Sequence, residues 1–316
     1  MSLNLIVDEE NVGNRVDAFV ASKCEKISRS LAQKLIKEEK ILVDNKVTKV
    51  SNKLAINQVV FVPEDAEAEK PDNLIAEDLP IDIIYEDEDI IVVNKPKDMV
   101  VHPAVGNSTG TLVNAVLGKH DLSDLNGDFR PGIIHRLDKN TTGALVIAKN
   151  NYAHQNIAEQ IKNRTTKKIY IALVRGLINE NNGVINMPIG RHPTDRKKMA
   201  VVKNGKEAET HFKVLKRYTY ENLAGNKNLS NNGYTLVEIE LKTGRTHQIR
   251  VHMSHIGYPV VGDDVYSSGK NPFGVTSQML HAHILGFEHP NKKEWVEYKA
   301  PLPEYFEKII SELKEL

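Results

Sequence analysis

The sequence predicts an α+β protein of two units, the larger of which is built on a largely antiparallel mixed sheet with flanking helices. Apolar segments typical of strands outnumber helical segments and do not alternate with them strictly, which favours this class over a parallel α/β fold. The chain has 316 residues, and because a typical domain has roughly 100–200 residues, we expect two. An acidic, proline-containing stretch near residue 70 indicates the boundary between them.

The composition is typical of a globular protein from a reducing compartment. Hydrophobic residues make up 40% of the chain and charged residues 27%, which argues against wholesale disorder. A single cysteine, Cys24, excludes an internal disulfide and a cysteine zinc cluster. The apolar runs are shorter than the ~20 residues that a membrane span needs, and the first ten residues do not resemble a secretory signal. We therefore expect a cytoplasmic protein without membrane contact.

The net charge is zero, with 42 basic and 42 acidic side chains, but the charges are segregated along the chain. Residues 23–53 carry nine basic and four acidic side chains. Residues 64–89 carry one basic and twelve acidic side chains, and residues 191–206 carry six basic side chains and one acidic side chain. A single charge run is usually only a solvated surface, although clustered basic residues also suit RNA phosphates. We predict a first domain over residues 1–62, an acidic linker over 63–80 and a second domain over 81–316.

The first domain is expected to contain two short helices and a small hairpin. Apolar residues at helical spacing predict a helix over residues 15–22, and Ser30 with Gln33 forms the pattern of a capping box for a second helix. The segments 41–47, which contains a turn, and 59–62 predict short strands.

The order of these elements resembles the S4 RNA-binding domain over residues 13–62. Basic residues fall on the second helix and on the turn of the hairpin, away from the apolar stripe. The resemblance implies that Arg29 and Lys34 of that helix contact RNA.

The second domain is expected to be rich in strands. Its apolar segments are bounded by turn residues, as strands are, and apolar residues at helical spacing predict one helix over residues 151–164. The predicted strands cover residues 83–85, 90–96, 133–138 (a strand running into a loop), 143–148, 168–174, 208–215 and 234–242.

The densest polar segment of the second domain is His135-Arg136-Leu137-Asp138-Lys139-Asn140-Thr141-Thr142-Gly143, which lies between two apolar segments. A carboxylate placed between buried strands is costly unless it is paired or functional. By chemistry alone, Asp138 could equally cap backbone amides in a turn.

A second polar segment, Thr243-Gly244-Arg245-Thr246-His247-Gln248-Ile249-Arg250-Val251-His252, follows a predicted strand. Arginines in a cleft bind phosphates or hold carboxylates by two-point contacts, so Arg245 and Arg250 are candidates for either role. The histidines lack the spacing of a zinc site and no cysteine completes one, so we expect no metal.

Five strings in this order resemble the RluA-type RNA pseudouridine synthases, and they span most of residues 81–304. The strings are Val93-Asn94-Lys95-Pro96, His135-Arg136-Leu137-Asp138, Lys168-Ile169-Tyr170-Ile171-Ala172-Leu173, Gly244-Arg245-Thr246-His247-Gln248-Ile249-Arg250-Val251-His252 and Leu280-His281-Ala282. With the S4-like unit and residues 190–201, they are similar to the branch that modifies 23S ribosomal RNA of the large subunit. The resemblance implies site-specific isomerisation of uridine to pseudouridine in RNA, without a cofactor.

The resemblance also implies roles for individual residues. Asp138 aligns with the catalytic aspartate, and Arg250 with the arginine that pairs with it, through a planar two-point contact. Tyr170 aligns with the tyrosine that stacks on uracil, and Leu280 with the apolar wall of the pocket. Arg136 aligns with the arginine that enters the RNA where the target base has left.

The reaction breaks the N1–C1′ bond, turns the uracil and joins C5 to C1′, so it needs no redox cofactor, metal or nucleotide. A carboxylate can serve as nucleophile or as the base that removes a ribose proton. Attack at C1′, attack at C6 and a glycal route all stay open. The base must leave its stack first, and the detached uracil must be shielded from water.

The expected partner is ribosomal RNA, either free or within a pre-ribosomal subunit, and we expect a monomer. Competing functions are an inactive RNA-binding or ribosome-biogenesis factor, and a synthase acting on another RNA such as tRNA. A glycoside or nucleoside hydrolase is a further alternative, but such enzymes typically position two carboxylates, and one acid lies in a motif here.

Overall fold

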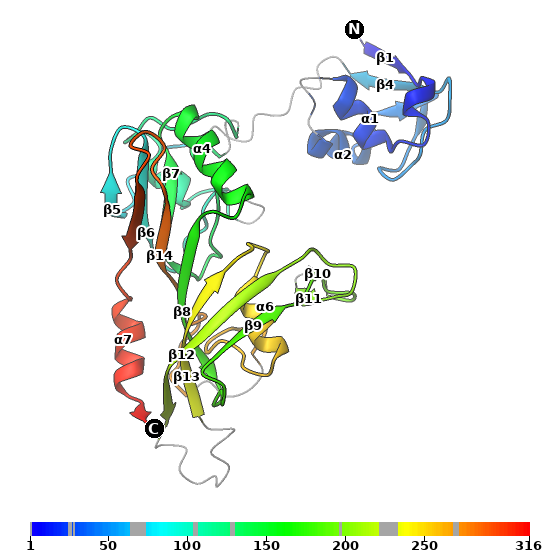
Figure 1. Ribbon diagram of the computed structural model, residues 1–316. Helices are drawn as coiled ribbons and strands as arrows, with labels where there is room; N and C mark the ends of the chain where they lie inside the picture. Colours follow the sequence, from blue (N-terminus) through cyan, green and yellow to red (C-terminus); the bar gives the residue numbers. More distant parts are fainter. Residues whose placement is uncertain are drawn as a thin grey trace. The chain divides into compact units, whose positions relative to one another are not determined.

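The computed structural model describes residues 2–24, 27, 29–63, 74–103, 107–126, 130–195, 198–220, 233–267 and 272–316. The chain forms two compact units, residues 1–74 and 75–316 (Figure 1). Residues 64–73, the most acidic part of the predicted linker, lie outside the described residues. Residues 75–80 of the predicted linker belong to the second unit, where Asn114 Nδ2 donates to the carbonyl of Ile75 at 2.8 Å.

The first unit combines two helices with a 4-stranded antiparallel sheet in the order β1-β4-β2-β3. The elements are β1 (Ser2–Ile6), η1 (Glu9–Asn11), α1 (Val16–Lys23), α2 (Arg29–Lys37), β2 (Leu42–Val43), β3 (Lys46–Val47) and β4 (Val59–Pro63). Both predicted helices and the predicted hairpin are therefore present, whereas β1 was not predicted. A core that includes Val16, Phe19, Leu35 and Val60 joins the helices to the sheet.

A buried carboxylate ties α1 to α2. Asp17 is fully buried and accepts hydrogen bonds from Arg15 Nε at 2.9 Å and from Arg29 Nε at 3.0 Å. Gln33, predicted to form a capping box with Ser30, donates instead to Asp17 at 2.6 Å, and the Ser30 side chain lies outside the described part. Burial opposes the charge of Asp17, but these hydrogen bonds outweigh it and lower its pKa well below the ordinary range.

The described part of the second unit is built on a 10-stranded sheet. Its main path is β16-β12-β13-β8-β14-β7-β6-β5, with β9 paired to β12 and β15 paired to β14. The pair β7–β14 is parallel, and the other pairs described are antiparallel, which confirms the predicted α+β class.

Except for residues 133–138, each predicted segment contains an observed element, and most bounds agree within about two residues; β12 extends four residues beyond its predicted end. The strands are β5 (Asp82–Glu86), β6 (Ile90–Lys95), β7 (Thr142–Ala148), β8 (Lys167–Arg175), β9 (Asn182–Asn186), β12 (Glu209–Thr219), β13 (Gly233–Leu241), β14 (Leu280–Glu288), β15 (Trp295–Lys299) and β16 (Lys314–Glu315). A separate hairpin consists of β10 (Ile189–Arg191) and β11 (Met199–Val201), and the helices are α3 (Leu112–Val116), α4 (Asn151–Lys162), α6 (Gln248–His255) and α7 (Glu304–Ser311).

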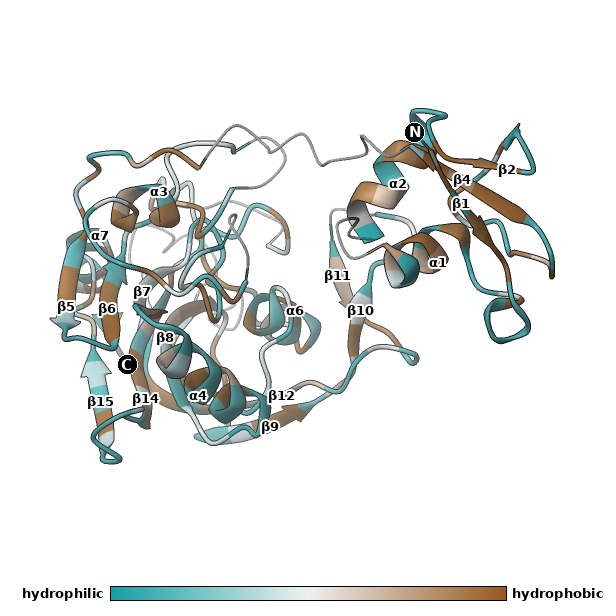
Figure 2. Ribbon diagram, turned by 90° about the horizontal axis from the view of Figure 1, so that it is seen from above, coloured by the Kyte–Doolittle hydropathy of each residue, from teal (hydrophilic) through white to brown (hydrophobic). Residues whose placement is uncertain are grey.

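The central strands are buried on both faces. Every residue of β7 is buried, as are the first four of β6, so these strands read as continuous apolar runs. Figure 2 shows β6 and β14 coloured mostly as hydrophobic. On one side α4 packs Ala153 and Ile157 into the core of β6, β7 and β14. No helix among the described residues is long and apolar enough to cross a bilayer.

The strand predicted over residues 133–138 is not formed. Ile133 makes only an isolated bridge to Ile147, and the segment that follows has no strand structure up to Asp138. The ring of His135 accepts the amide hydrogen of Val146 at 3.1 Å. The backbone N–H of Val146 in β7 is therefore bonded to a side chain and not to the carbonyl of a neighbouring strand. The segment therefore passes along β7 as a loop that leads to Asp138.

A glycine allows β7 and β14 to meet beside that loop. Gly143 has φ +114°, and a Cβ at this position would lie 2.1 Å from the carbonyl oxygen of Ala282. A residue without a side chain is therefore required where the parallel pairing of β7 with β14 begins. The contact brings the start of β14, with Leu280, next to the end of the loop.

Candidate active site

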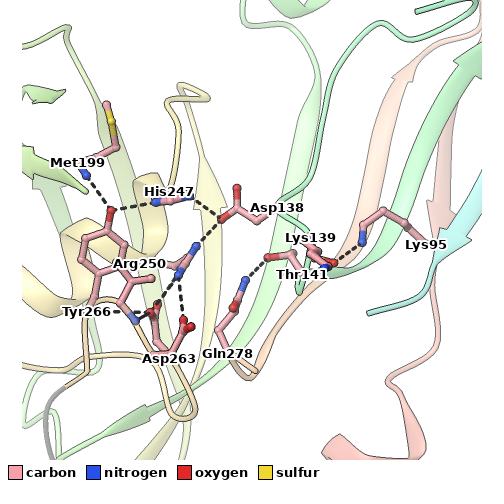
Figure 3. A network of polar contacts seen from close by, with 12 residues as sticks. Lys95, Asp138, Lys139, Thr141, Met199, His247, Arg250, Asp263, Tyr266 and Gln278 are labelled. Carbon is pink, nitrogen blue, oxygen red and sulfur yellow. Dashed lines mark hydrogen bonds and ion pairs between the residues drawn. The ribbon is translucent and has the colours of Figure 1, made fainter. Parts of the chain in front are cut away.

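Asp138 opens a tight turn just before β7, and we call residues 138–141 the Asp138 turn. The amide of Thr141 donates to the Asp138 carbonyl at 3.1 Å, which closes the turn. Lys95 Nζ donates to the carbonyl of Lys139 at 3.0 Å, and Gln278 Nε2 donates to the Thr141 hydroxyl at 3.1 Å (Figure 3). The backbone around the carboxylate is thus fixed by a side chain of β6, by a side chain of the segment before β14 and by the hydrogen bond within the turn.

Lys95 is a fully buried side chain at the end of β6. Its ammonium group also donates to the carbonyls of Pro96 at 2.7 Å and Met99 at 2.9 Å. Burial lowers the pKa of Lys95 to about 7, although the charge of Asp138 opposes this shift. Lys95 therefore shapes the Asp138 turn through backbone carbonyls and does not touch its carboxylate directly.

The turn lies at one end of a pocket of about 120 Å³. The loop before β7, the strands β8 and β14, and the segment leading into α6 together form its wall. The predicted site residues of the second unit that line it are Arg136, Asp138, Tyr170, Arg245, Arg250 and Leu280. Residues predicted from separate strings are thus brought together, while Arg29 and Lys34 lie in the first unit.

Arg250 reaches the carboxylate from α6. Its Nη1 donates to Asp138 Oδ2 at 3.0 Å, whereas Nε and Nη2 donate to the two oxygens of Asp263 at 2.7 and 3.0 Å. The planar two-point contact predicted for Asp138 is therefore made with Asp263, and Asp138 receives one N–H. Burial opposes the charge of Arg250, but the hydrogen bonds and charges of the two carboxylates outweigh it and raise the pKa of the guanidinium.

Asp263 and Tyr266 are site residues that the sequence did not predict. Asp263 is fully buried, and besides Arg250 its Oδ1 accepts the backbone amides of Val265 at 2.9 Å and Tyr266 at 3.0 Å. The guanidinium carbon of Arg250 lies 5.2 Å from the centre of the Tyr266 ring, a cation–π contact. A buried arginine needs more than one carboxylate oxygen, and that requirement was the signal that could have pointed to a second acid.

His247 stands at the start of α6, next to Arg250 on the same face. Its Nε2 lies 3.9 Å from Asp138 Oδ2, and its Nδ1 lies 2.9 Å from the hydroxyl of Tyr266. Its backbone is left-handed, with φ 56° and ψ 22°, and this conformation turns the ring toward the pocket. Burial, the largest effect, lowers the pKa of His247 below its ordinary value, although the charge of Asp138 opposes this shift, and the net shift favours the neutral imidazole.

The other polar residues of the same string serve the fold. Gln248 is buried, and its amide bridges Thr210 and the carbonyl of Glu209 to the turn that precedes α6. His252 contacts the Thr210 hydroxyl and the carbonyl of Met187, each at 2.9 Å. The polar residues of this string therefore have two roles. Gln248 and His252 hold α6 in place, whereas His247 and Arg250 face Asp138.

Tyr170 and Leu280 form the apolar part of the pocket. They lie on the adjacent strands β8 and β14, where Tyr170 pairs with Ala282 and Ala172 with Leu280. Both are buried. Burial, with a smaller contribution from the charge of Asp138, raises the pKa of Tyr170 above the ordinary range, so its hydroxyl stays protonated and the ring is uncharged.

The two arginines at the pocket differ in how they are held. Arg136 precedes Asp138 by two residues and is exposed to solvent. Arg245 is anchored, because its Nε donates to the carbonyl of Glu207 at 2.9 Å. Arg136 can therefore change its conformation more freely than Arg245.

In the first unit, Arg29 and Lys34 both belong to α2. The Arg29 side chain is 55% exposed although it is tied to Asp17, so the buried carboxylate presents the guanidinium at the surface. Lys34 lies 3.8 Å from Glu38, one helical turn along the chain.

One group of described residues has the composition of a metal site, Asp87, Asp89 and His289. Its atoms already have protein partners. His289 Nε2 lies 2.8 Å from Asp87 Oδ2, and its Nδ1 accepts backbone amides of Asn291 and Lys292. We therefore interpret the group as a structural network away from the pocket.

Comparisons with known proteins agree with this arrangement. Residues 89–255 match the family model described as RNA pseudouridylate synthase. The RNA pseudouridine synthase YlyB of Bacillus subtilis is 43% identical over 99% of this chain and 98% of its own length. Ribosomal large subunit pseudouridine synthase D of Pseudomonas aeruginosa is 39% identical over 96% of this chain and 93% of its own. The solved structure of human RNA pseudouridylate synthase domain containing 1 has a TM-score of 0.60 and 28% identity, covering 76% of this chain and 91% of that one.

The matches include the residues that meet in the pocket. The family model spans Asp138, Tyr170 and Arg250, and the relatives match nearly the whole chain, including the first unit. The family expected from the five strings is thereby confirmed. The chain belongs to the RNA pseudouridine synthases.

Proposed function

We propose that this RNA pseudouridine synthase isomerises uridine in 23S ribosomal RNA of the large subunit, with Asp138 as its catalytic carboxylate. Relatives named ribosomal large subunit pseudouridine synthase D, from Pseudomonas aeruginosa, Neisseria meningitidis and Nitrosomonas europaea, support this choice of RNA. We place the reaction in the cytoplasm, on free ribosomal RNA or a pre-ribosomal subunit, with the protein acting as a monomer.

The observation that carries the proposal is one half-buried carboxylate between a charged wall and an apolar wall. Asp138 receives a hydrogen bond from Arg250, and Tyr170 and Leu280 line the same pocket. A flat aromatic ring and an aliphatic side chain suit a detached uracil, which must stay close without access to water. The carboxylate at their edge suits attack on, or proton removal from, the nucleoside.

Arg250 would keep Asp138 ready for this chemistry. Its guanidinium is positively charged throughout the working pH range, and a positive charge 3.0 Å from Oδ2 stabilises the carboxylate anion. Tyr170, whose pKa burial raises further above the working pH range, would stack as an uncharged ring on uracil without repelling its negative charge.

The arginines and the first unit would engage the RNA around the target. Extruding a base costs a few kcal/mol, and the exposed Arg136 could fill the vacated space. Arg245 at the pocket edge, and Arg29 and Lys34 on α2 of the S4-like unit, would contact phosphates, which fixes the register without reading the sequence.

Release of tritium from C5 of labelled uridine in a ribosomal RNA transcript tests the catalytic assignment. We expect no detectable release with Asp138→Asn, which keeps the side-chain shape but removes the negative charge, and near-normal RNA binding. Asp121→Asn, at an exposed acid of the same unit, serves as the matched control and should act like the parent. Activity of Asp138→Asn within roughly tenfold of the parent would contradict the assignment.

Maps of pseudouridine in cellular RNA test the choice of substrate. A strain lacking the protein should lose pseudouridine from 23S ribosomal RNA, and the parent gene but not Asp138→Asn should restore it. Loss from tRNA alone would contradict the ribosomal target. Free uracil in place of an isomerised nucleoside would indicate a hydrolase.

A further inference from the structure

The contacts of Asp138 with its surroundings are one-sided. Within the described residues, both side chains that approach its carboxylate reach the same oxygen, Oδ2: Arg250 Nη1 at 3.0 Å and His247 Nε2 at 3.9 Å. Two partners on one oxygen fix the rotation of the carboxylate and leave Oδ1 for the reacting nucleoside. The orientation of the His247 ring therefore bears on which oxygen reacts.

The Tyr266 hydroxyl sets that ring. It accepts the backbone amide hydrogen of Met199 on β11 at 2.9 Å, and it lies 2.9 Å from His247 Nδ1 (Figure 3). With the amide hydrogen directed at the oxygen, the hydroxyl hydrogen is available to donate to Nδ1. Because a neutral imidazole carries one N–H, Nε2 then bears the hydrogen and directs it toward Asp138.

The opposite tautomer is unfavourable on electrostatic grounds. It would place the lone pair of His247 Nε2 against the negatively charged Oδ2, and two acceptors on that side of the ring would repel each other. Tyr266 is itself fixed, because its own amide donates to buried Asp263 at 3.0 Å and its ring packs edge-on against His247, with centroids 5.6 Å apart.

We propose that His247 and Tyr266 are positioning residues of this synthase: the Tyr266 hydroxyl holds the Nε2–H tautomer of His247, which with Arg250 secures Oδ2 of Asp138 and leaves Oδ1 to react. The inference rests on the proposed role of Asp138. At 3.9 Å the contact from Nε2 is longer than a hydrogen bond, so its effect is to orient the carboxylate, and Arg250 supplies the direct bond.

Kinetics of the full-length protein on the tritiated transcript test the proposal. Tyr266→Phe keeps the ring but removes the hydroxyl. We expect kcat to fall roughly fivefold to tenfold, the factor that corresponds to one neutral hydrogen bond, with KM within about twofold of the parent. Tyr218→Phe, at a tyrosine buried in the core of the same unit, is the matched control and should leave both constants unchanged.

A double-mutant cycle separates positioning from a general loss of structure. His247→Gln carries an amide N–H at the reach of Nε2, and this donor does not depend on a tautomer. If Tyr266 acts through His247, adding Tyr266→Phe to His247→Gln should cost no further kcat, within about twofold. Independent, multiplicative losses in the double variant would overturn the proposal, as would equal kinetics for Tyr266→Phe and Tyr218→Phe.

A spectroscopic measurement gives a readout that does not involve turnover. Nitrogen-15 NMR of histidine-labelled protein should show His247 as the Nε2–H tautomer, and Tyr266→Phe should convert it to a mixture. A protonated Nδ1 in the parent protein would overturn the proposal. Failure here stays distinct from failure of the proposed function: an active Asp138→Asn contradicts the function, whereas an inactive Asp138→Asn with an unaffected Tyr266→Phe contradicts only this inference.

Discussion

Arg250 shows that a single side chain can connect two carboxylates that are far apart in the sequence. Its Nη1 bonds to Asp138 in the turn before β7, while Nε and Nη2 bond to Asp263 after α6. Asp263 satisfies the two-point geometry, so the guanidinium is held in place before it meets Asp138. Asp138 thereby keeps one oxygen out of the ion pair.

Replacement of Arg250 should cost both stability and activity. Arg250→Ala leaves two carboxylates in a mostly buried site without their cation, and breaking a buried pair costs about 3–5 kcal/mol. Denaturant unfolding should show a loss in this range, and tritium release should be abolished. Arg250→Lys should recover stability only in part, since an ammonium cannot make the two-point contact with Asp263.

An exposed arginine provides the control for this prediction. Arg164 makes a two-point contact with Glu207 at 3.0 and 2.9 Å, but both side chains are largely exposed. Because exposed ion pairs contribute ~0–1 kcal/mol, Arg164→Ala should change stability little and leave turnover intact. If Arg164→Ala and Arg250→Ala lost the same free energy of unfolding, burial of the Arg250–Asp263 pair would not increase its contribution to stability.

Lys95 gives a prediction about pH. Its folded-state pKa, lowered by burial to about 7, lies below the ordinary value of 10.5, so the unfolded chain binds more protons between these two values. Stability from this group must therefore rise with pH across that window, by up to about 1.4 kcal/mol per pH unit. Below about pH 7 both states are protonated and the contribution no longer changes.

The measurement is the slope of unfolding free energy against pH between about 7 and 10. Lys95→Met should show a smaller rise than the parent, while Lys97→Met, at an exposed lysine two residues later, should keep the parental slope. If Lys95→Met keeps the parental slope, the pKa of Lys95 is not lowered in the folded protein. If its unfolding free energy rises more steeply with pH than that of the parent, the pKa of Lys95 is raised.

The pocket depends on the parallel contact between β7 and β14. Register pairs His281 with Thr142 and Ala282 with Gly143, and a hydrogen bond of 2.8 Å joins the Thr142 hydroxyl to His281 Nδ1. This short contact brings Leu280 to the Asp138 turn. The two strands, Thr142–Ala148 and Leu280–Glu288, are far apart in the sequence of the second unit, so this part of the pocket wall forms only when they pair.

Gly143→Ala should separate these strands. Its Cβ would lie 2.1 Å from the Ala282 carbonyl oxygen, a backbone atom that cannot turn aside, at φ +114°. We expect a loss of several kcal/mol, above the ~1–2 kcal/mol cost of a side chain in a left-handed conformation alone, and a drop in kcat. Thermal unfolding and tritium release measure the two effects.

Gly257→Ala is the matched control for this substitution. Gly257 also has a positive φ, +89°, but an added Cβ would meet no atom within 4 Å. It should therefore show only the conformational cost, without loss of turnover. If both variants lose the same stability, the close approach of β14 to Gly143 is not what requires glycine there.

Each of the two units has its own hydrophobic core. The first unit packs its helices on its sheet around Phe19 and Ile36, and the second unit has separate cores on its sheet. The second unit contains the complete pocket. We therefore expect the first unit to contribute to RNA binding and the second unit to carry out the reaction.

Deletion of residues 1–70 should weaken RNA binding and spare the chemistry. For every phosphate that the protein no longer neutralises, the log–log salt slope of binding becomes shallower by ~0.9 on a duplex and ~0.7 on a single strand. The truncated protein should therefore bind with lower affinity and a shallower slope, and saturating RNA should restore much of the rate. An unchanged slope together with a lower melting temperature would show that the first unit only stabilises the second.

Elements with local signals could be predicted from the amino-acid sequence. The continuous apolar runs predicted β6, β7 and β8, the helical spacing predicted α4, and the fold class was correct. Through the resemblance to a known family the sequence also identified six residues that line the pocket, including Asp138, Tyr170 and Arg250. Apolar runs and helical spacing can be read from the sequence because each depends on neighbours within a few residues along the chain.

The partners of these residues could not be predicted from the sequence, because they come from segments that are distant along the chain. The Asp263 carboxylate, the Tyr266 hydroxyl and the amide of Met199 meet Arg250 and His247 because a loop after α6 and the β10–β11 hairpin converge on one helix face. Likewise His135, expected in a strand, replaces a strand's backbone acceptor with its ring. Such contacts depend on how distant segments pack. They are favoured because a polar group that becomes buried on folding must form a hydrogen bond to replace those it made with water.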